Sequence, residues 1–175
     1  KNIAISTVFA VFLALGGYFF IGSGSDETTP LKLNAIAIVP LSSDSNSQDQ
    51  INLANGLTQD IGGGLTQASR GLNVITLNEK PKDPKTINKD TGASYILQGS
   101  LRQSTGTLRV SINFIDAINM TTIWSQNYDR KLVASNIFEL QDEIVNSIVD
   151  QLVGNGAILA QQVAQKVSSA GTQNL

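Results

Sequence analysis

The chain has 175 residues, with 12 lysines and arginines against 14 aspartates and glutamates, and it contains neither cysteine nor histidine. Its length is that of one domain. Without cysteine there can be no disulfide, thiolate nucleophile or cysteine-ligated zinc, and without histidine no Ser-His-Asp triad or zinc-hydrolase site. The net charge is -2 and no run of lysine or arginine is present, so we expect no binding to nucleic acid.

The first feature in chain order is residues 3–21, IAISTVFAVFLALGGYFFI, which carry no charge. At about 1.5 Å of rise per residue, an apolar helix of this length nearly spans the hydrocarbon core of a bilayer. We therefore predict a transmembrane helix over residues 1–22 and a linker over residues 23–34, with the lipid bilayer as one partner of the chain. A cleaved secretory signal peptide is the alternative, so whether residues 1–22 are retained stays open.

The charges on either side of this segment predict its orientation. Lys1 precedes it, and Asp26 and Glu27 follow it. Positive residues stay on the cytoplasmic side, so we expect a single-pass protein of the bacterial inner membrane with a periplasmic C-terminal domain. Because the sequence starts at lysine instead of methionine, we also expect a further, cytoplasmic part before it.

Small residues recur along one face of the predicted membrane helix. Ser6, Ala10 and Ala14 follow at four-residue spacing, and Gly17 lies close to the same face. Small residues let two helices approach closely, which predicts a dimerisation face. They are also common in membrane helices that do not pair, and this alternative stays open.

The body of the chain predicts an α+β domain over residues 35–153, followed by a C-terminal helix and tail over residues 154–175. Periodicity indicates strands at residues 35–41, 72–76, 93–102, 107–116 and 121–129, and helices at residues 51–70, 86–92 and 135–153. The last three strands should form an antiparallel meander, and residues 42–50 a polar loop. The fold class is thus a mixed sheet of about five strands in the order β-α-β-α-β-β-β-α, covered by helices.

Three consecutive glycines, Gly62, Gly63 and Gly64, interrupt the first of these helices. No lysine follows them and they do not lie between a strand and a helix, so a phosphate-binding loop is a poor interpretation. Each glycine inside a helix costs about 1 kcal/mol relative to alanine. We predict either a close approach of the helix to the sheet or a flexible point.

No pattern in the chain predicts a catalytic, cofactor or metal site, and we expect no enzymatic activity of this chain. Asp116 and Asp129 should end strands by accepting hydrogen bonds in turns. Trp124, Tyr128 and Arg130 share one face of a strand, because side chains alternate along it. They predict an interaction surface for a protein partner or for self-association. The alternative is packing in the core, with Arg130 covering the edge of the sheet.

Segments spread over more than a hundred residues resemble the TolB N-terminal-like domain, as it occurs in membrane-anchored class III adenylate cyclases, winged-helix regulators and tetratricopeptide proteins. The segments are residues 35–41 (AIAIVPL), 54–61 (ANGLTQDI), 92–102 (GASYILQGSLR), 115–117 (IDA), Trp124 with Tyr128-Asp129-Arg130, and 137–144 (IFELQDEI). They follow the order and spacing of that family. No 34-residue repeat follows residue 152.

The resemblance implies a function for the whole protein more than for these residues. It implies a non-catalytic sensory or interaction domain outside the cytoplasm, joined to a cytoplasmic class III adenylate cyclase, or else to a winged-helix regulator. A ligand or partner would bias the geometry of a dimer, and the membrane helix would transmit the change. An envelope-assembly or structural protein that binds other envelope components is the alternative.

Overall fold

The computed structural model describes residues 35–132 and 136–172. The predicted membrane helix, the linker and the proposed dimerisation face (Ser6, Ala10, Ala14 and Gly17) lie outside these residues. None of the helices within the described ranges combines the length and the apolarity that crossing a bilayer requires.

The described elements match the predicted order, with two additions. In chain order they are β1 (Ala35–Ile38), β2 (Ser42–Ser43), α2 (Gln48–Ala68), β3 (Asn73–Thr76), the 3-10 helix η1 (Pro84–Thr86), α3 (Ile87–Thr91), β4 (Tyr95–Ser104), β5 (Thr107–Asp116), β6 (Thr121–Lys131), α4 (Ile137–Leu152) and α5 (Ile158–Thr172). The predicted α+β class with a mixed sheet is confirmed.

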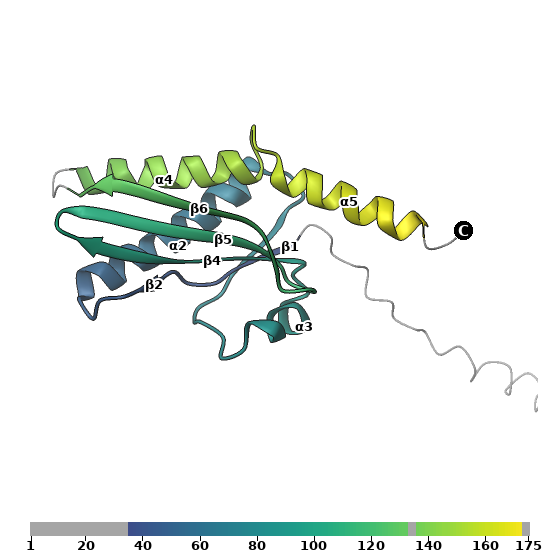
Figure 1. Ribbon diagram of the computed structural model, residues 1–175, viewed down its shortest axis with the longest axis horizontal. Helices are drawn as coiled ribbons and strands as arrows, with labels where there is room; N and C mark the ends of the chain where they lie inside the picture. Colours follow the sequence, from purple (N-terminus) through teal and green to yellow (C-terminus); the bar gives the residue numbers. More distant parts are fainter. Residues whose placement is uncertain (1–34, 133–135, 173–175) are drawn as a thin grey trace, which may run out of the picture. The chain divides into compact units, whose positions relative to one another are not determined.

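The sheet has the strand order β3-β1-β4-β5-β6 (Figure 1). β1 pairs in parallel with β3 and β4, whereas β4, β5 and β6 form the predicted antiparallel meander. The prediction of about five strands and of a loop over residues 42–50 was wrong in one respect, since β2 is a sixth strand. β4 has ten residues and extends past the end of β1, so Ser42 and Ser43 pair with its free edge at Ser100 and Leu101.

Helices α2 and α4 cover one face of the sheet (Figure 1). Their apolar stripes and the alternate residues of β4 and β5 form the main core. Its largest fully buried side chains include Tyr95, Phe114, Leu57, Ile61 and Leu65. The alternation that predicted β5 therefore separates core from surface as expected.

The three glycines of α2 lie in an unbroken helix. A Cβ atom on Gly62 would lie 2.7 Å from Oγ1 of Thr76, and one on Gly64 would lie 2.9 Å from Cγ2 of Val149. Their missing side chains thus let α2 lie close to β3 on one side and to α4 on the other. The predicted close approach to the sheet is confirmed.

A smaller apolar cluster lies on the opposite face of the sheet. It consists of Ala35, Ala37, Val39, Ile87, Ala93, Ile96, Ile115 and Ala117, with Leu77 and Met120 packed against it. The segment that carries η1 and α3 covers this end of the sheet (Figure 1). No described element covers the rest of this face, on β4, β5 and β6.

Candidate functional site

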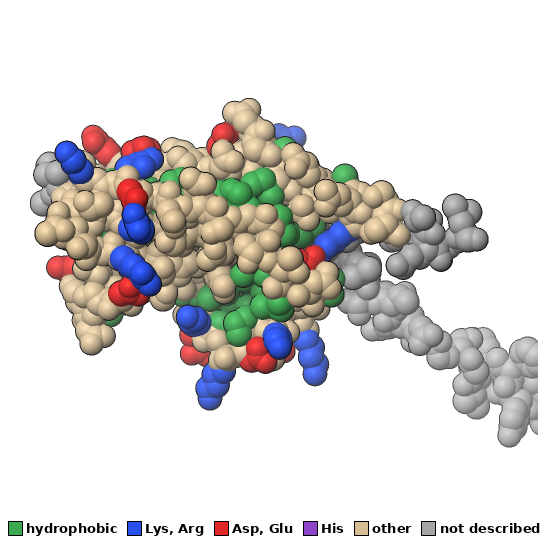
Figure 2. All heavy atoms as spheres, viewed as in Figure 1, with side chains coloured by type: hydrophobic (Ala, Val, Ile, Leu, Met, Phe, Trp, Pro, Cys, Tyr) green, Lys and Arg blue, Asp and Glu red, His purple; other side chains and the backbone are tan. Residues whose placement is uncertain are grey.

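The uncovered face of β4, β5 and β6 carries polar and charged side chains in cross-strand rows. The rows are Gln98, Asn113 and Ser125; Ser100, Ser111 and Asn127; and Arg102, Arg109 and Asp129. Figure 2 shows this face as a broad uncharged polar area with oppositely charged side chains at one end. Ser125 Oγ donates a hydrogen bond to Oδ1 of Asn113 at 2.7 Å, so part of the face is held by its own side chains.

The charged row is neutralised within the chain. Arg109 binds Asp129 through two hydrogen bonds of 2.6 and 2.8 Å, and Arg102 lies 2.5 Å from a carboxylate oxygen of Asp44. The hydrogen bond from Arg109 holds the pKa of Asp129 below its usual value. The prediction that Asp129 ends a strand was wrong, because β6 continues to Lys131 and Asp129 pairs across the sheet instead. Within the described residues, no group of three or more histidine, cysteine or acidic residues could hold a metal ion.

The predicted interaction residues Trp124, Tyr128 and Arg130 lie on the helix side of β6. Their cross-strand neighbours Phe114, Val110 and Leu108 are all core residues. Tyr128 is buried and Trp124 is half-buried against the core. Nη2 of Arg130 lies 2.7 Å from Oε1 of Glu143, which connects β6 to α4. The structure thus brings the three residues together, and their binding to a partner stays a prediction.

Truncating two of these side chains should have unequal effects on stability. Trp124→Ala removes a half-buried indole from the core, and we expect it to lower the free energy of unfolding by about 2 kcal/mol. Arg130→Ala removes an exposed ion pair, and we expect a loss below about 1 kcal/mol. Urea denaturation of both variants checks this. Equal losses would mean that Trp124 is not held by the core.

A second polar cluster holds α5 against the ends of β4 and β5. Nζ of Lys166 on α5 lies 2.8 Å from Oδ2 of Asp116 and 4.4 Å from the centre of the Tyr95 ring. The other oxygen of Asp116 accepts hydrogen bonds from the backbone N–H groups of Ile118 and Asn119. The prediction that Asp116 ends a strand in this way is confirmed, whereas its pairing with Lys166 was not predicted.

The aromatic ring of Tyr95 contributes packing contacts to this cluster, whereas its hydroxyl group makes no hydrogen bond within the described residues. The ring stacks on Phe114 with centroids 5.2 Å apart. The hydroxyl is buried and has no hydrogen-bond partner among the described residues. Burial, with the nearby charge of Asp116, raises the pKa of Tyr95 to about 12, so the group is neutral at physiological pH.

Tyr95→Phe is therefore expected to keep the stability of the protein or to raise it. The phenyl ring preserves the stacking and the contact with Lys166, and it removes a buried polar atom that costs about 1 kcal/mol when it is unpaired. Thermal denaturation of wild type and variant measures the effect. A loss above about 1 kcal/mol would show that the hydroxyl has a bonded partner, such as a buried water.

The turn between α4 and α5 sets the direction of α5. The backbone N–H of Gly156 donates to the carbonyl of Asp150 at 3.1 Å, and the side chain of Asp150 accepts two hydrogen bonds from Asn155. Ala157 has a φ of 44°, a left-handed value that a side chain disfavours. The turn is thus a defined structure, and α5 leaves it in one direction.

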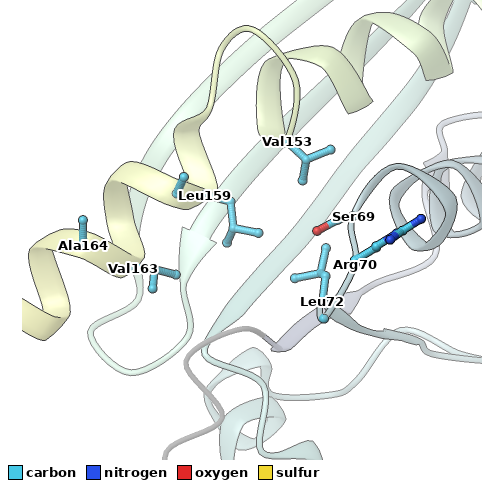
Figure 3. A pocket seen from close by; sticks show the side chains of 9 residues that line it. Ser69, Arg70, Leu72, Val153, Leu159, Val163 and Ala164 are labelled. Carbon is cyan, nitrogen blue, oxygen red and sulfur yellow. The ribbon is translucent and has the colours of Figure 1, made fainter.

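A cavity of about 370 Å³ lies between α5 and the segment that follows α2. Leu72, Val153, Leu159 and Val163 line it with apolar side chains, and Figure 3 shows them converging from the two sides. In the same view the side chain of Arg70 extends away from α5. The cavity therefore has an apolar wall, and the guanidinium group of Arg70 does not point into it.

Comparison with known proteins identifies a relative among adenylate cyclases. The chain is 33% identical over 124 residues to "Putative adenylate cyclase 3" of Rhizobium meliloti, an alignment that covers 67% of this chain and 21% of that protein. The chain therefore spans about a fifth of the length of this relative. No family model matches the chain.

Two solved structures are among those that are similar to the chain. A putative neuraminyllactose-binding hemagglutinin homolog from Helicobacter pylori has a TM-score of 0.53 at 15% identity, over 81% of this chain and 92% of that one. TolB from Acinetobacter baumannii has a TM-score of 0.47 at 18% identity, over 69% of this chain and 28% of TolB. The first likeness shows a shared fold and nothing of function.

These findings agree with one part of the predicted resemblance, the association with adenylate cyclases. The similarity to an adenylate cyclase is found over 21% of that protein. The associations with winged-helix regulators and with tetratricopeptide proteins stay predictions.

Proposed function

We propose that this chain is a non-catalytic interaction domain of a membrane-anchored bacterial signalling protein that also contains a class III adenylate cyclase. The observation that carries the proposal is the 33% identity to a putative adenylate cyclase, confined to 21% of that protein. A domain that occupies a fifth of such an enzyme is expected to act beside the catalytic part.

The structure supports a role in binding in two ways. On the uncovered face of β4, β5 and β6, the arginines form ion pairs with aspartates of this chain. The face therefore presents neutral polar groups, which suit a polar interface. Helix α5 leaves the domain in a direction fixed by its turn and by the pairing of Lys166 with Asp116. Both the neutral face and the fixed helix are preformed surfaces, and a preformed surface loses less conformational entropy when a partner binds.

The place of the domain outside the cytoplasm is part of the proposal and rests on residues 1–27. Alkaline phosphatase, which is active only outside the cytoplasm, is fused after Leu175 of the full-length protein. We expect high phosphatase activity, and low activity when residues 3–21 are deleted. Low activity of the first fusion, with high activity of a β-galactosidase fusion at the same position, would place the domain inside the cell.

The coding sequence in which residue 1 lies tests the cyclase part of the proposal. We expect it to encode a class III cyclase upstream, and deletion of residues 35–153 to change the production of cyclic AMP by the full-length protein. An upstream sequence consisting of only an initiator methionine and a few residues would instead favour the alternative, a protein of envelope assembly.

A further inference from the structure

The outer edge of β6 is unpaired within the described part of the chain. The backbone N–H of Leu132 donates to the carbonyl of Gly106 at 2.8 Å, and the pairing of β5 with β6 has no register shift from Thr107 to Phe114. In an antiparallel pair, hydrogen-bonded positions alternate. From Trp124 to Arg130 the even-numbered residues therefore bond to β5, whereas Ser125, Asn127 and Asp129 direct their N–H and C=O groups away from the sheet.

Features that prevent another strand from pairing with an edge lie only at the two ends of β6. The register shift between Phe114 and Ile115 lies at one end, and Asp129, Arg130 and Lys131 lie at the other. Bulges and charges of this kind prevent pairing between sheets. The five residues between them, Trp124 to Tyr128, carry no charge and follow a regular register. The middle of the edge is thus open to a further strand.

The charge pattern of β6 selects the orientation of a second copy. In a parallel pair, Asp129, Arg130 and Lys131 would each face the same residue of the other copy, which destabilises the pair. In an antiparallel pair centred on Asn127, Asp129 faces Ser125 and Arg130 faces Trp124, so that each charge meets a neutral side chain. The odd-numbered residues, with their outward backbone groups, also face one another.

A buried hydroxyl at this edge points to the same partner. Tyr128 has a hydroxyl that is buried without a hydrogen-bond partner among the described residues. Tyr128 and Gln126 of β6 line a cavity of about 310 Å³ together with Ser147, Asp150 and Gln151 of α4. In the pair centred on Asn127, the amide of Gln126 from the second copy lies directly opposite Tyr128.

We propose that β6 pairs with β6 of a second copy of this chain, antiparallel and about a two-fold axis at Asn127, so that the two sheets become continuous. A two-fold axis makes one self-complementary edge sufficient for both copies. The inference refines the interaction role proposed above by naming its surface and its partner. Its test is independent of the phosphatase fusions, so one can fail while the other holds.

The absence of cysteine from the chain makes a site-specific test possible. Asn127→Cys places one thiol on the axis, where the paired Cα atoms would lie about 5.5 Å apart, within the range of about 4.4 to 6.8 Å that a disulfide needs. Under mild oxidation of the full chain in detergent micelles, we expect most of this variant to become a disulfide-linked dimer. Ser125→Cys and Ser111→Cys, on the same face but off the axis, should remain largely monomeric.

Asn127→Pro tests the pairing without a cross-link. The N–H of Asn127 points away from β5, so proline at this edge position leaves the existing sheet intact. We expect sedimentation velocity to show a wild-type dimer and a variant monomer at about 100 μM, with equal thermal stability of the two at dilutions where the wild type is also monomeric. A monomeric wild type at this concentration would overturn the proposal. So would equal cross-linking of all three cysteine variants, or a dimer that survives Asn127→Pro but is lost in Ala10→Leu with Ala14→Leu.

Discussion

Replacing Gly99 by alanine is expected to lower the free energy of unfolding by about 2 to 3 kcal/mol. Gly99 lies on β4 between the residues that pair with β1 and those that pair with β2. A Cβ atom there would overlap the carbonyl oxygen of Ser111 on β5 and lie 2.7 Å from Cδ2 of Leu41. The carbonyl belongs to the β4–β5 pairing, and the backbone N–H of Leu41 is bound to Oγ1 of Thr58 at 3.0 Å, so neither neighbour can move freely.

Gly63→Ala provides the matched control. Gly63 is exposed on α2, and a Cβ atom on it would have no atom within 4 Å. Alanine there should raise the free energy of unfolding by about 1 kcal/mol, because it restricts the unfolded chain and favours the helix. Urea denaturation of both variants gives the comparison. If Gly99→Ala were as stable as wild type, the strand packing described around Leu41 would be incorrect.

The glycines of α2 show which structural features could be predicted from the sequence and which could not. Alternation and helical periodicity are local, so they located β5 and α4 well. The role of Gly62 and Gly64 was predictable only as a choice between close approach and flexibility, because the residues that they approach, Thr76 and Val149, are distant in sequence. β2 was not predictable, since two serines have no periodicity and pair only because β4 is long.

In the candidate site, too, the local features could be predicted from the sequence and the contacts between distant residues could not. The sequence placed Trp124, Tyr128 and Arg130 on one face, because alternation along a strand is a local property. It could not show that this face lies under α4, with Arg130 bound to Glu143. The cluster of Tyr95, Asp116 and Lys166 was missed for the same reason, because its members come from β4, β5 and α5 and share no local pattern.

Lys166→Met is expected to lower the free energy of unfolding by about 2 kcal/mol. The side chains of Lys166 and Asp116 are 22% and 10% exposed, so the substitution leaves a largely buried carboxylate without its cation. Two backbone hydrogen bonds to Asp116 remain, which keeps the loss below that of a fully buried pair. Arg102→Met is the control, because its ion pair with Asp44 is 65% and 54% exposed and should contribute less than about 1 kcal/mol. Equal losses in urea denaturation would mean that the pairing does not hold α5.

The contribution of Asp116 should also disappear in acid. Burial by itself would raise the pKa of Asp116, but the hydrogen bonds from Lys166, Asn119 and Ile118 outweigh it and hold the pKa below its usual value. A carboxyl group with a lowered pKa in the folded state adds stability above its unfolded pKa of about 4, and this stability is lost as the pH falls through the folded pKa. We therefore expect the stability difference between wild type and Asp116→Asn to be largest near neutral pH and to shrink below about pH 4. In Lys166→Met the loss should begin at higher pH, because the strongest of the hydrogen bonds that lower the pKa is gone. Urea denaturation across this pH range measures both effects, and a difference that stays constant with pH would contradict the assigned ion pair.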